Sequence, residues 1–360
     1  MENMGLKAGS ILIIGNLGYI GPVAVKYFKQ QYPGIKISGY DIGYFMQQYT
    51  SHGLIGETSL ERQYFGDVRN FDENILDGMD AVIYLAAISN DPMGNAYEKP
   101  TLDINYHAAI DIAGKAKKQG VKNFVFASSC SVYGFADTVA RTETSEINPL
   151  TAYAKSKVYA EEGLAPLATS NFKITCLRYA TACGFSDRLR LDLVLNDFVA
   201  GAIVDKKITI LSDGTPWRPL IHVKDMSRAM DWAASREERP DFLIVNTGSN
   251  SWNYQVKELA YNVQKAFNDV EISINENAQP DKRSYKVSFD LFNKIAPANF
   301  QPQVTLAKAV EELKLGLEAI QFSDKNFRQS HLIRLKTIQQ LIAEGFINKN
   351  LFKTDQKNNL

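Results

Sequence analysis

The first half of this 360-residue chain alternates short, continuous apolar segments with longer amphipathic ones. The apolar segments are predicted to be strands at Ser10–Ile14, Lys36–Tyr40, Tyr64–Gly66, Ala81–Ala86, Asn123–Ser128 and Lys173–Arg178. Helical periodicity predicts helices between several of them, at Pro22–Gln31, Tyr97–Gln119 and Ala152–Leu167. Strands that are apolar on both faces and separated by helices are typical of a parallel sheet covered on both sides. The sequence therefore predicts an α/β fold with a doubly wound parallel sheet of the Rossmann type.

Composition narrows the classes of partner. The 40 Lys and Arg residues balance 40 Asp and Glu residues, so no global field attracts nucleic acid or an anionic membrane, and we expect neither as a partner. The three cysteines (Cys130, Cys176 and Cys183) form no C-x-x-C pair, and the four histidines are scattered, so we expect no disulfide framework and no metal site. No apolar run reaches the roughly 18 residues of a membrane helix. These features predict a cytoplasmic protein.

After Tyr179 the alternation becomes less regular. Helices are expected around Leu191–Val204, Asn253–Phe267 and Thr305–Ala319, and short strands near Ile208–Leu211 and Phe242–Asn246. This change indicates a second, smaller mixed α/β unit that contributes ligand contacts. From Ser323 onward an amphipathic pattern predicts a terminal helix that packs on its own domain, with an oligomer contact as the alternative.

A glycine-rich loop directly follows the first predicted strand. Its glycines are Gly15, Gly18 and Gly21, and Pro22 then occupies a position suited to the first turn of a helix. Glycines let the backbone approach a pyrophosphate, and the N–H groups and dipole at the helix start attract its charge. A tight strand-to-helix turn without a ligand explains the loop alone equally well, so the decision depends on its context.

Two aspartates supply that context. Asp41 ends the second predicted strand, where an acid accepts hydrogen bonds from the adenosine ribose and disfavours the additional phosphate of NADP. The predicted cofactor is therefore NAD. Asp67 ends the third strand and is expected to reach the adenine edge, with a solvated loop acid as the alternative.

Tyr153 and Lys157 are four residues apart on a predicted helix and therefore project from one face. A neighbouring ammonium and the positive nicotinamide ring would lower the pKa of the tyrosine, which makes Tyr153 a candidate proton acceptor. Ser129 follows a strand whose carboxyl end opens on the expected ligand site, and it is the candidate for the hydroxyl that bonds the reacting oxygen. A surface tyrosine over a lysine stem is the alternative for the pair.

Several motifs occur in a fixed order, and together they resemble the extended short-chain dehydrogenase/reductase superfamily, the NAD-dependent nucleotide-sugar epimerases and dehydratases. The resemblance covers about residues 10–320. It rests on the glycine loop, Asp41, Asp67-Val68, Leu85-Ala86-Ala87, Asn105, the run Ser128-Ser129-Cys130-Ser131-Val132-Tyr133-Gly134, Tyr153-x-x-x-Lys157, Leu177-Arg178-Tyr179, and the segment from Arg218-Pro219-Leu220 to Asp225.

The resemblance implies roles at the matching positions. Cofactor contacts are expected at Gly15, Gly18, Tyr19, Ile20, Gly21, Asp41, Asp67, Val68, Leu85, Ala86, Ala87, Asn105, Ser128, Tyr153, Lys157 and Tyr179, with Lys157 also binding the nicotinamide ribose. Substrate contacts are expected at Ser129, Ser131, Thr181, Arg188, Arg190, Asn196, Arg218 and Arg283, among which Arg218 and Arg283 match residues that bind the diphosphate of a sugar nucleotide. The matching histidine, His222, implies support of a local turn rather than catalysis.

Departures from the family pattern narrow the reaction. The 4,6-dehydratases carry an Asp-Glu pair where this chain has Cys130 and Ser131, and Cys130 is expected to pack away from the site. The segments Arg178-Tyr179-Ala180-Thr181 and Trp217-Arg218-Pro219-Leu220 also replace the R-Y-F-N and R-D-Y of galactose-type epimerases, which leaves the sugar and the nucleotide open.

The expected function is NAD-dependent epimerisation of a nucleotide sugar, at C4, with Tyr153 as base and Lys157 and Ser129 assisting. The alternatives are a net NAD(P)-dependent dehydrogenase or reductase, or a dehydratase, of a nucleotide-activated sugar, and a non-catalytic dinucleotide-binding protein.

The domains follow from this interpretation. Residues 8–180 are expected to form the NAD-binding unit, with 206–248 partly returning to it. Residues 181–205 and 249–322 are expected to form the smaller substrate-binding unit, and 323–360 a C-terminal helix and tail. A homodimer formed through helices Tyr97–Gln119 and Ala152–Leu167 is implied by the resemblance alone.

Overall fold

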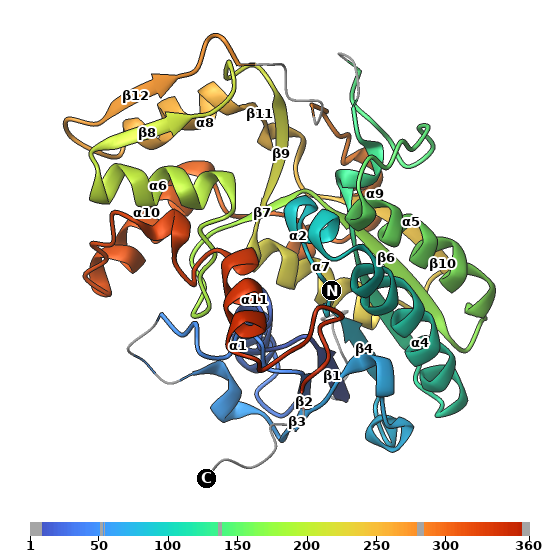
Figure 1. Cartoon of the computed structure of the whole chain (residues 1–360). Helices are drawn as coiled ribbons and strands as arrows, with labels where there is room; N and C mark the ends of the chain where they lie inside the picture. Colours follow the sequence, from blue (N-terminus) through green and yellow to red (C-terminus); the bar gives the residue numbers. More distant parts are fainter. Residues whose placement is uncertain (1–8, 51–52, 54, 136–138, 279–283, 355–360) are drawn as a thin grey trace.

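The computed structural model describes residues 9–50, 53, 55–135, 139–278 and 284–354. A seven-stranded sheet forms its centre, in the order β10-β6-β5-β4-β1-β2-β3 (Figure 1). Its strands are β1 (Ser10–Ile14), β2 (Lys36–Asp41), β3 (Arg62–Phe65), β4 (Ala81–Tyr84), β5 (Asn123–Ser129), β6 (Lys173–Tyr179) and β10 (Phe242–Thr247). Every pairing in it is parallel. The predicted doubly wound sheet is therefore confirmed.

The central strands divide their side chains between two cores. In β1, Ile11 and Ile13 belong to the core that contains α1 (Gly21–Gln31) and α7 (Val223–Ser235). Leu12 and Ile14 belong to the opposite core, with α4 (Ala108–Lys118) and α5 (Ala152–Leu164). This alternation explains why the strand sequences are apolar throughout, since both faces of the sheet are covered.

The helix predicted over Tyr97–Gln119 is one run with a change of winding. It consists of α3 (Glu98–Leu102), a π-helical turn at Asp103–His107 and α4, and the short helix α2 (Asp91–Ala96) precedes it. A single π turn within an α-helix is common near functional sites.

The smaller unit lies above the carboxyl ends of the sheet strands in Figure 1. It contains α6 (Val194–Val204), α8 (Val256–Gln264), α9 (Asp290–Ile295) and α10 (Leu306–Ala319). Its sheets pair β8 (Lys207–Ile210) with β12 (Glu271–Ile274), and β9 (Trp217–His222) with both β7 (Thr181–Cys183) and β11 (Asn253–Gln255).

The helix expected over Asn253–Phe267 is shorter than predicted. Its first three residues pair with β9 as strand β11, and the helix begins only at Val256. A capping box between Gln255 and Glu258 fixes that start. Helical periodicity alone did not reveal this boundary.

The C-terminal segment returns to the large sheet. Helix α11 (Arg334–Ala343), red in Figure 1, packs near α2, and the chain beyond it runs toward β2 and β3. Ile338, Ile347 and Leu351 are buried in the same core as Tyr40. The amphipathic terminal pattern thus packs on its own chain, as predicted.

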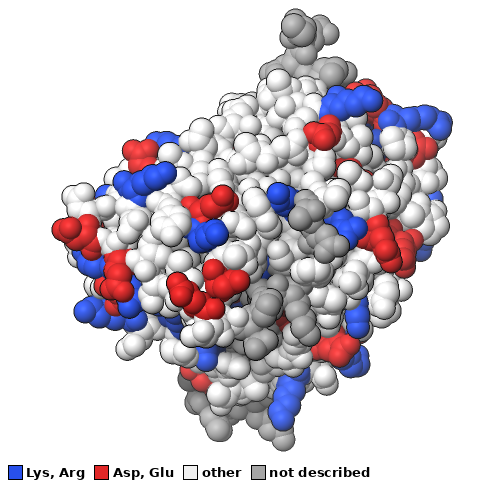
Figure 2. Space-filling model, turned by 90° about the horizontal axis from the view of Figure 1, so that it is seen from above, with Lys and Arg blue, Asp and Glu red and all other residues white. Residues whose placement is uncertain are grey.

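The surface carries no field of a single sign on the face shown in Figure 2, where basic and acidic side chains are interspersed. Among the described residues, no helix combines the length and the apolar character that crossing a membrane requires.

Candidate active site

A continuous cleft follows the carboxyl ends of the parallel strands. Its larger part, a cavity of about 960 Å³, lies between the end of β5, the start of α5 and the smaller unit. Its smaller part, about 130 Å³, lies over the glycine loop and the ends of β1, β2 and β4. Tyr19, Ile20, Leu85 and Arg190 line both parts. The cleft therefore occupies the point between β1 and β4 where the strand order reverses, the usual ligand position in open α/β sheets.

The glycine loop forms the floor of the smaller cavity. Gly15 has a φ of +89°, and a Cβ there would lie 2.5 Å from the backbone nitrogen of Ala86. Helix α1 follows without a side-chain cap, so its first N–H groups need another partner. Gly15, Gly18, Tyr19 and Ile20 line the cavity, whereas Gly21 does not. A Cβ at Gly21 would lie 2.0 Å from the carbonyl oxygen of Asn16, so Gly21 is required for close packing of the loop, and its cofactor contact stays a prediction.

Asp41 lies at the end of β2, in the wall of the same cavity. Its carboxylate accepts hydrogen bonds from the backbone N–H groups of Leu17 at 3.0 Å and Gly43 at 2.7 Å. Burial raises its pKa, and the two N–H bonds, with Arg188 and Arg334, oppose that rise. The loop and the acid thus lie in one cavity, in the arrangement that a dinucleotide requires.

The third strand places Asp67 and Val68 in the same cavity. The Asp67 carboxylate forms an ion pair with Arg69 at 2.5 Å and also accepts from the Arg69 backbone N–H at 2.9 Å. It is therefore an ion-paired acid in the cavity wall rather than a solvated loop residue, and its contact with the adenine edge stays a prediction.

Leu85, Ala86 and Ala87 line the cavity as predicted, but Asn105 does not. Asn105 is fully buried behind the wall, accepts from the Ile88 N–H at 2.8 Å and donates to Ser156 Oγ at 3.0 Å. Asn105 thus braces the segment after β4, because its amide satisfies that segment's backbone, and its expected cofactor contact stays a prediction.

The predicted catalytic residues meet in the larger cavity. Ser129 ends β5, and Tyr153 and Lys157 project from the first turns of α5; all three line the cavity. Burial raises the pKa of Tyr153 to about 12, and a hydrogen bond with Ser129 works in the opposite direction. The cation that lowers the pKa of Tyr153 is Arg190 and not the expected Lys157. The protein's own groups therefore keep the Tyr153 hydroxyl protonated at neutral pH.

Lys157 is almost completely buried. Its Nζ donates to the carbonyl oxygen of Ala127 at 2.7 Å and lies 5.7 Å from the centre of the Tyr153 ring. Burial lowers its pKa to about 7, and the negative charge of Glu161 partly offsets this effect. Lys157 is thus positioned beside Tyr153 and changes charge near neutral pH.

A buried network supports this group from behind. The Ser128 hydroxyl, expected to contact the cofactor, donates to Glu161 at 2.5 Å. Arg178 in turn holds the Glu161 carboxylate with two bonds of 2.9 and 2.6 Å. Ser128 lines the cleft, but its hydroxyl is committed to the network. Tyr179 also lines the cleft, and its hydroxyl donates to the carbonyl oxygen of Met226 at 3.2 Å.

The expected substrate residues separate into two groups. Ser129, Ser131, Thr181, Arg190 and Arg218 line the larger cavity. The Ser131 hydroxyl is buried there without a hydrogen-bond partner, an arrangement that costs free energy unless a ligand supplies the partner.

Arg188 and Asn196 do not line the cleft. The Arg188 guanidinium forms an ion pair with Glu57 instead. Asn196 is fully buried, accepts from the Gly184 N–H at 3.0 Å and donates to the Tyr19 hydroxyl at 3.0 Å. Both side chains thus make structural contacts here, and their expected substrate contacts stay predictions, while Arg283 lies outside the described residues.

Several lining residues were not predicted. Asp91 and Thr151 face the cavity, and the Thr151 hydroxyl donates to Asp91 at 2.6 Å. Asp197 and Arg328 pair at 2.8 Å on the opposite wall. The Asn90 side chain caps α2 by accepting from the Met93 N–H. Asn followed by Asp-Pro is a sequence signal for a helix start, and it could have located Asp91 at the first turn of α2.

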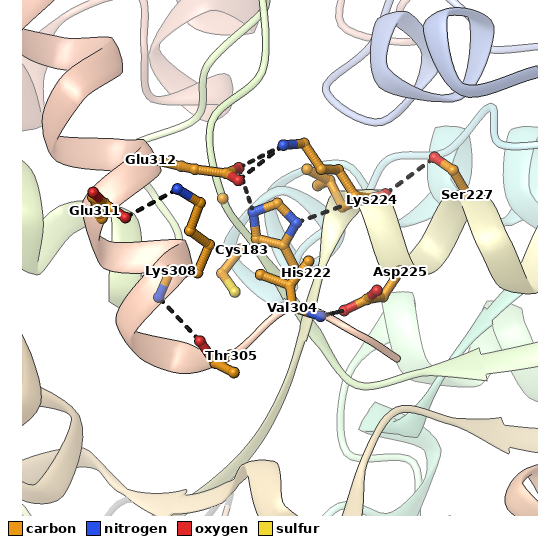
Figure 3. Close-up of polar contacts among 12 residues, drawn as sticks. Cys183, His222, Lys224, Asp225, Ser227, Val304, Thr305, Lys308, Glu311 and Glu312 are labelled. Atoms are coloured by element: carbon orange, nitrogen blue, oxygen red, sulfur yellow. Dashed lines mark hydrogen bonds and ion pairs between the residues drawn. The ribbon is translucent and has the colours of Figure 1, made fainter. Parts of the chain in front are cut away.

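His222 lies outside the cleft lining, as predicted for a structural histidine. Its Nδ1 accepts from the Lys224 N–H at 3.2 Å, and Nε2 faces Glu312 of α10 at 3.5 Å (Figure 3). Burial lowers its pKa to about 4, so it is neutral at physiological pH. Cys130 also points away from the cleft, since its thiol contacts the carbonyl oxygen of Arg178 at 3.1 Å.

The comparisons with known proteins agree with this geometry. The model of the NAD dependent epimerase/dehydratase family matches residues 11–248. The chain belongs to the NAD-dependent epimerase/dehydratase family. It is thus an enzyme of an NAD-dependent family, in agreement with the acid at the end of β2, and its fold class and cofactor are as predicted.

Individual relatives share the family at low identity. A UDP-glucose 4-epimerase of Corynebacterium glutamicum is 26% identical over 268 residues, covering 69% of this chain and 78% of the relative. A solved UDP-glucose-4-epimerase from Stenotrophomonas maltophila, with bound NAD, has a TM-score of 0.72 at 21% identity and covers 87% of this chain and 99% of its own. An NAD-dependent NDP-hexosamine 5,6-dehydratase of tunicamycin biosynthesis, TunA, also has a TM-score of 0.72 at 21% identity, covering 88% and 99%. At this identity the structures show a shared fold.

Proposed function

We propose that this family member is a nucleotide-sugar epimerase that oxidises one ring carbon to a ketone and reduces it again on the other face. The observation that carries the proposal is the meeting of Ser129, Tyr153 and Lys157 in one cleft with the glycine loop. The names of the sequence relatives point to C4 of a UDP-sugar as the reacting carbon.

The glycine loop and Asp41 would hold the dinucleotide, with Lys157 near the nicotinamide ribose. Bound NAD supplies the hydride acceptor and donor, and its positive ring favours the ionised form of a neighbouring tyrosine. Tyr153 would take the proton of the sugar hydroxyl as the carbon is oxidised and return it on reduction, so the cycle consumes no proton overall.

Lys157 and Ser129 assist that proton transfer. A protonated Lys157 beside the ring stabilises a Tyr153 phenolate, and the Ser129 hydroxyl offsets part of the burial penalty that raises the pKa of Tyr153 to about 12. Because burial lowers the pKa of Lys157 to about 7, we expect the rate to depend on pH near neutrality.

The substrate end of the cleft offers groups for a sugar diphosphate. Arg190 and Arg218 provide guanidinium groups, and the unpartnered Ser131 hydroxyl and Thr181 provide polar contacts. Arg283 stays a proposed diphosphate contact by resemblance.

A dehydratase reading has less support. Dehydration needs an acid/base pair beside the catalytic hydroxyl, and Cys130 occupies one of the two positions with its thiol turned to a backbone carbonyl. Burial also raises the pKa of that thiol, which opposes a role in proton transfer.

The experiment is an incubation of the purified protein with UDP-, GDP-, CDP- and dTDP-sugars, followed by NMR of the sugar and absorbance of NADH. We expect interconversion of two epimers while NAD stays bound and no NADH accumulates. Stoichiometric NADH production with free cofactor exchange would instead establish a dehydrogenase.

A homodimer through the surface of α4 and α5 is a second part of the proposal. Tyr159 of α5 is 42% exposed, and its ring centre lies 5.7 Å from that of Tyr106. An exposed tyrosine ring beside a partly buried one in the π-helical turn before α4 suits a subunit interface. Light scattering of the wild-type protein and Tyr159→Glu tests it, and a monomeric wild type would refute it.

A further inference from the structure

Helix α11 places the buried guanidinium of Arg334 in the wall of the smaller cavity, beside the glycine loop. Arg334, its first residue, is 2% exposed and lines the same cavity as Gly15, Gly18 and Asp41. Its Nη2 donates to the carbonyl oxygen of Arg188 at 3.0 Å, whereas its Nη1 is buried without a hydrogen-bond partner. An unpaired guanidinium nitrogen in a cavity wall points to an anionic ligand.

The surrounding charges strengthen this reading. The neighbouring guanidinium groups each have a carboxylate: Arg190 pairs with Asp192 at 2.9 Å, and Arg188 pairs with Glu57. Among the residues that the structure describes, none forms an ion pair with Arg334. The Phe45 ring, 4.5 Å from the guanidinium carbon, adds a cation–π contact but neutralises no charge. Burial is the main cause that lowers the pKa of Arg334 to about 9; Arg190 and Arg188 lower it further, and the negative charge of Asp192 opposes them without forming an ion pair with Arg334.

We propose that Arg334 is a cofactor-binding residue whose guanidinium pairs with the diphosphate of the bound dinucleotide. Arg334 shares its cavity with the glycine loop, where the diphosphate belongs. A phosphate on the adenosine ribose is disfavoured, since the Asp41 carboxylate lies at that end of the cavity. The proposal rests on the NAD binding of the proposed function and is independent of the sugar reaction. Arg334 also lies beyond the residues matched by the family model.

The C-terminal segment fixes Arg334 in place at several points. Just before α11, the carbonyl oxygen of Leu332 accepts from the Leu191 N–H at 3.0 Å. Within α11, the Thr337 hydroxyl accepts from the side-chain amide of Gln48. Downstream, Arg69 donates to the carbonyl oxygens of Asn350 and Leu351 at 2.8 and 2.6 Å.

These contacts close the adenosine side of the cavity. Tyr44, which lines the cavity, bonds the carbonyl oxygen of Leu351, and the Arg69 guanidinium carbon lies 3.5 Å from the centre of the Phe352 ring. The docked segment holds Arg334 in the cavity wall, and under this proposal release of the dinucleotide breaks the ion pair between Arg334 and the diphosphate. Slow cofactor exchange suits an enzyme that returns its hydride to the same substrate.

The test compares the wild-type protein with Arg334→Gln, Arg334→Lys and the matched control Lys336→Gln, which removes one charge from a half-exposed position of the same helix. Bound NAD is counted after purification, and its exchange with isotopically labelled NAD is followed over a range of salt concentrations. We expect exchange about 10- to 100-fold faster in Arg334→Gln, from the strength of a charge-assisted bond, with a smaller change in Arg334→Lys and none in Lys336→Gln.

Thermal unfolding with and without added NAD separates binding from folding. In Arg334→Gln the stabilisation by NAD should shrink, whereas the NAD-free protein should unfold at the same or a higher temperature, because two neighbouring arginines lose a like charge. An unchanged exchange rate with a destabilised NAD-free protein would overturn the proposal in favour of a structural role. A change in NADP affinity alone would overturn the assignment to the diphosphate. Absence of sugar epimerisation would refute the proposed function but leave these readouts intact.

Discussion

The two ends of the cleft differ in the residues that form their walls. Around the glycine loop, the wall combines glycine backbone, as at Gly15, with larger apolar side chains such as Tyr44, and Arg334 is a buried cation that forms no ion pair among the described residues. At the substrate end, the wall consists of polar and charged side chains, among them Arg190 paired with Asp192 and Arg328 paired with Asp197. Where glycine backbone forms the wall, as at Gly15, a new side chain has no room. A lining side chain at the substrate end can be exchanged without displacing the backbone. We infer that the cofactor end fixes the chemistry and the substrate end adjusts the choice of sugar.

The largest expected effect falls where the two ends meet. Tyr153→Phe removes the hydroxyl that transfers the proton, and we expect turnover to fall by about 100-fold or more, the usual size of general acid–base effects. NAD content should stay at the wild-type level, since the ring is retained. Turnover is measured by NMR of the sugar, and an undiminished rate would exclude Tyr153 as the base.

Gly15→Ala tests the backbone character of the cofactor end. A Cβ there lies 2.5 Å from the Ala86 nitrogen at a φ of +89°, and the strain of about 1–3 kcal/mol should push the loop out of its binding position. We expect NAD occupancy to fall about tenfold, since 1.4 kcal/mol corresponds to about that factor. Bound nucleotide per protein chain is the readout.

Gly34→Ala is the matched control for that substitution, because a Cβ at Gly34 meets nothing within 4 Å. Equal loss of NAD in both variants would mean that the loop has no special steric requirement.

Two arginines that the resemblance assigns to the substrate, one inside the cavity lining and one outside it, test the substrate end. Arg218 lines the larger cavity, and we expect Arg218→Gln to raise KM about 10- to 100-fold through loss of a charge-assisted contact. Arg188 lies outside the lining, and Arg188→Gln should leave KM unchanged. It should lower the free energy of unfolding by about 3–5 kcal/mol, because Glu57 keeps a buried charge without its partner. Steady-state kinetics give KM and urea unfolding gives the free energy of unfolding. A raised KM in Arg188→Gln with an unchanged KM in Arg218→Gln would contradict this assignment.

The smallest effect concerns His222, which belongs to neither end of the cleft. Burial lowers its pKa from 6.5 to about 4, so between these values the unfolded chain binds more protons than the folded one. Stability should therefore decrease as the pH falls from about 6.5 to about 4, and this component should level off below that range. Urea unfolding from pH 4 to 7 should show a shallower slope for His222→Gln, and identical slopes would mean that the histidine titrates normally.

The cofactor end could be predicted from sequence because its parts lie within single strand–loop–helix units. Tyr153 and Lys157 share a helix face at a spacing of four, Gly15 directly follows β1, and Asp41 is the last residue of β2. The substrate end depends on pairings between distant segments: Arg328 meets Asp197 across 131 residues, and Arg188 turns to Glu57 across the same separation.

The tail shows the same limit on prediction. The spacing of apolar residues predicts the helix, but it does not predict that Arg334 lines the cofactor cavity. No local sequence pattern shows that the start of this helix is buried there. Sequence periodicity thus identifies elements, while the partner of each charged side chain is decided by tertiary packing.

The docking of the last turns on Arg69 also has a consequence for the order of biosynthesis. Arg69 and Leu351 are 282 residues apart, so this docking forms only after residue 351 has left the ribosome, well after β1 to β4. Until then the glycine loop, β2 and β4 can already form an open dinucleotide site. A nascent chain thus presents the glycine loop, β2 and β4 to the cofactor before the segment around Leu351 docks.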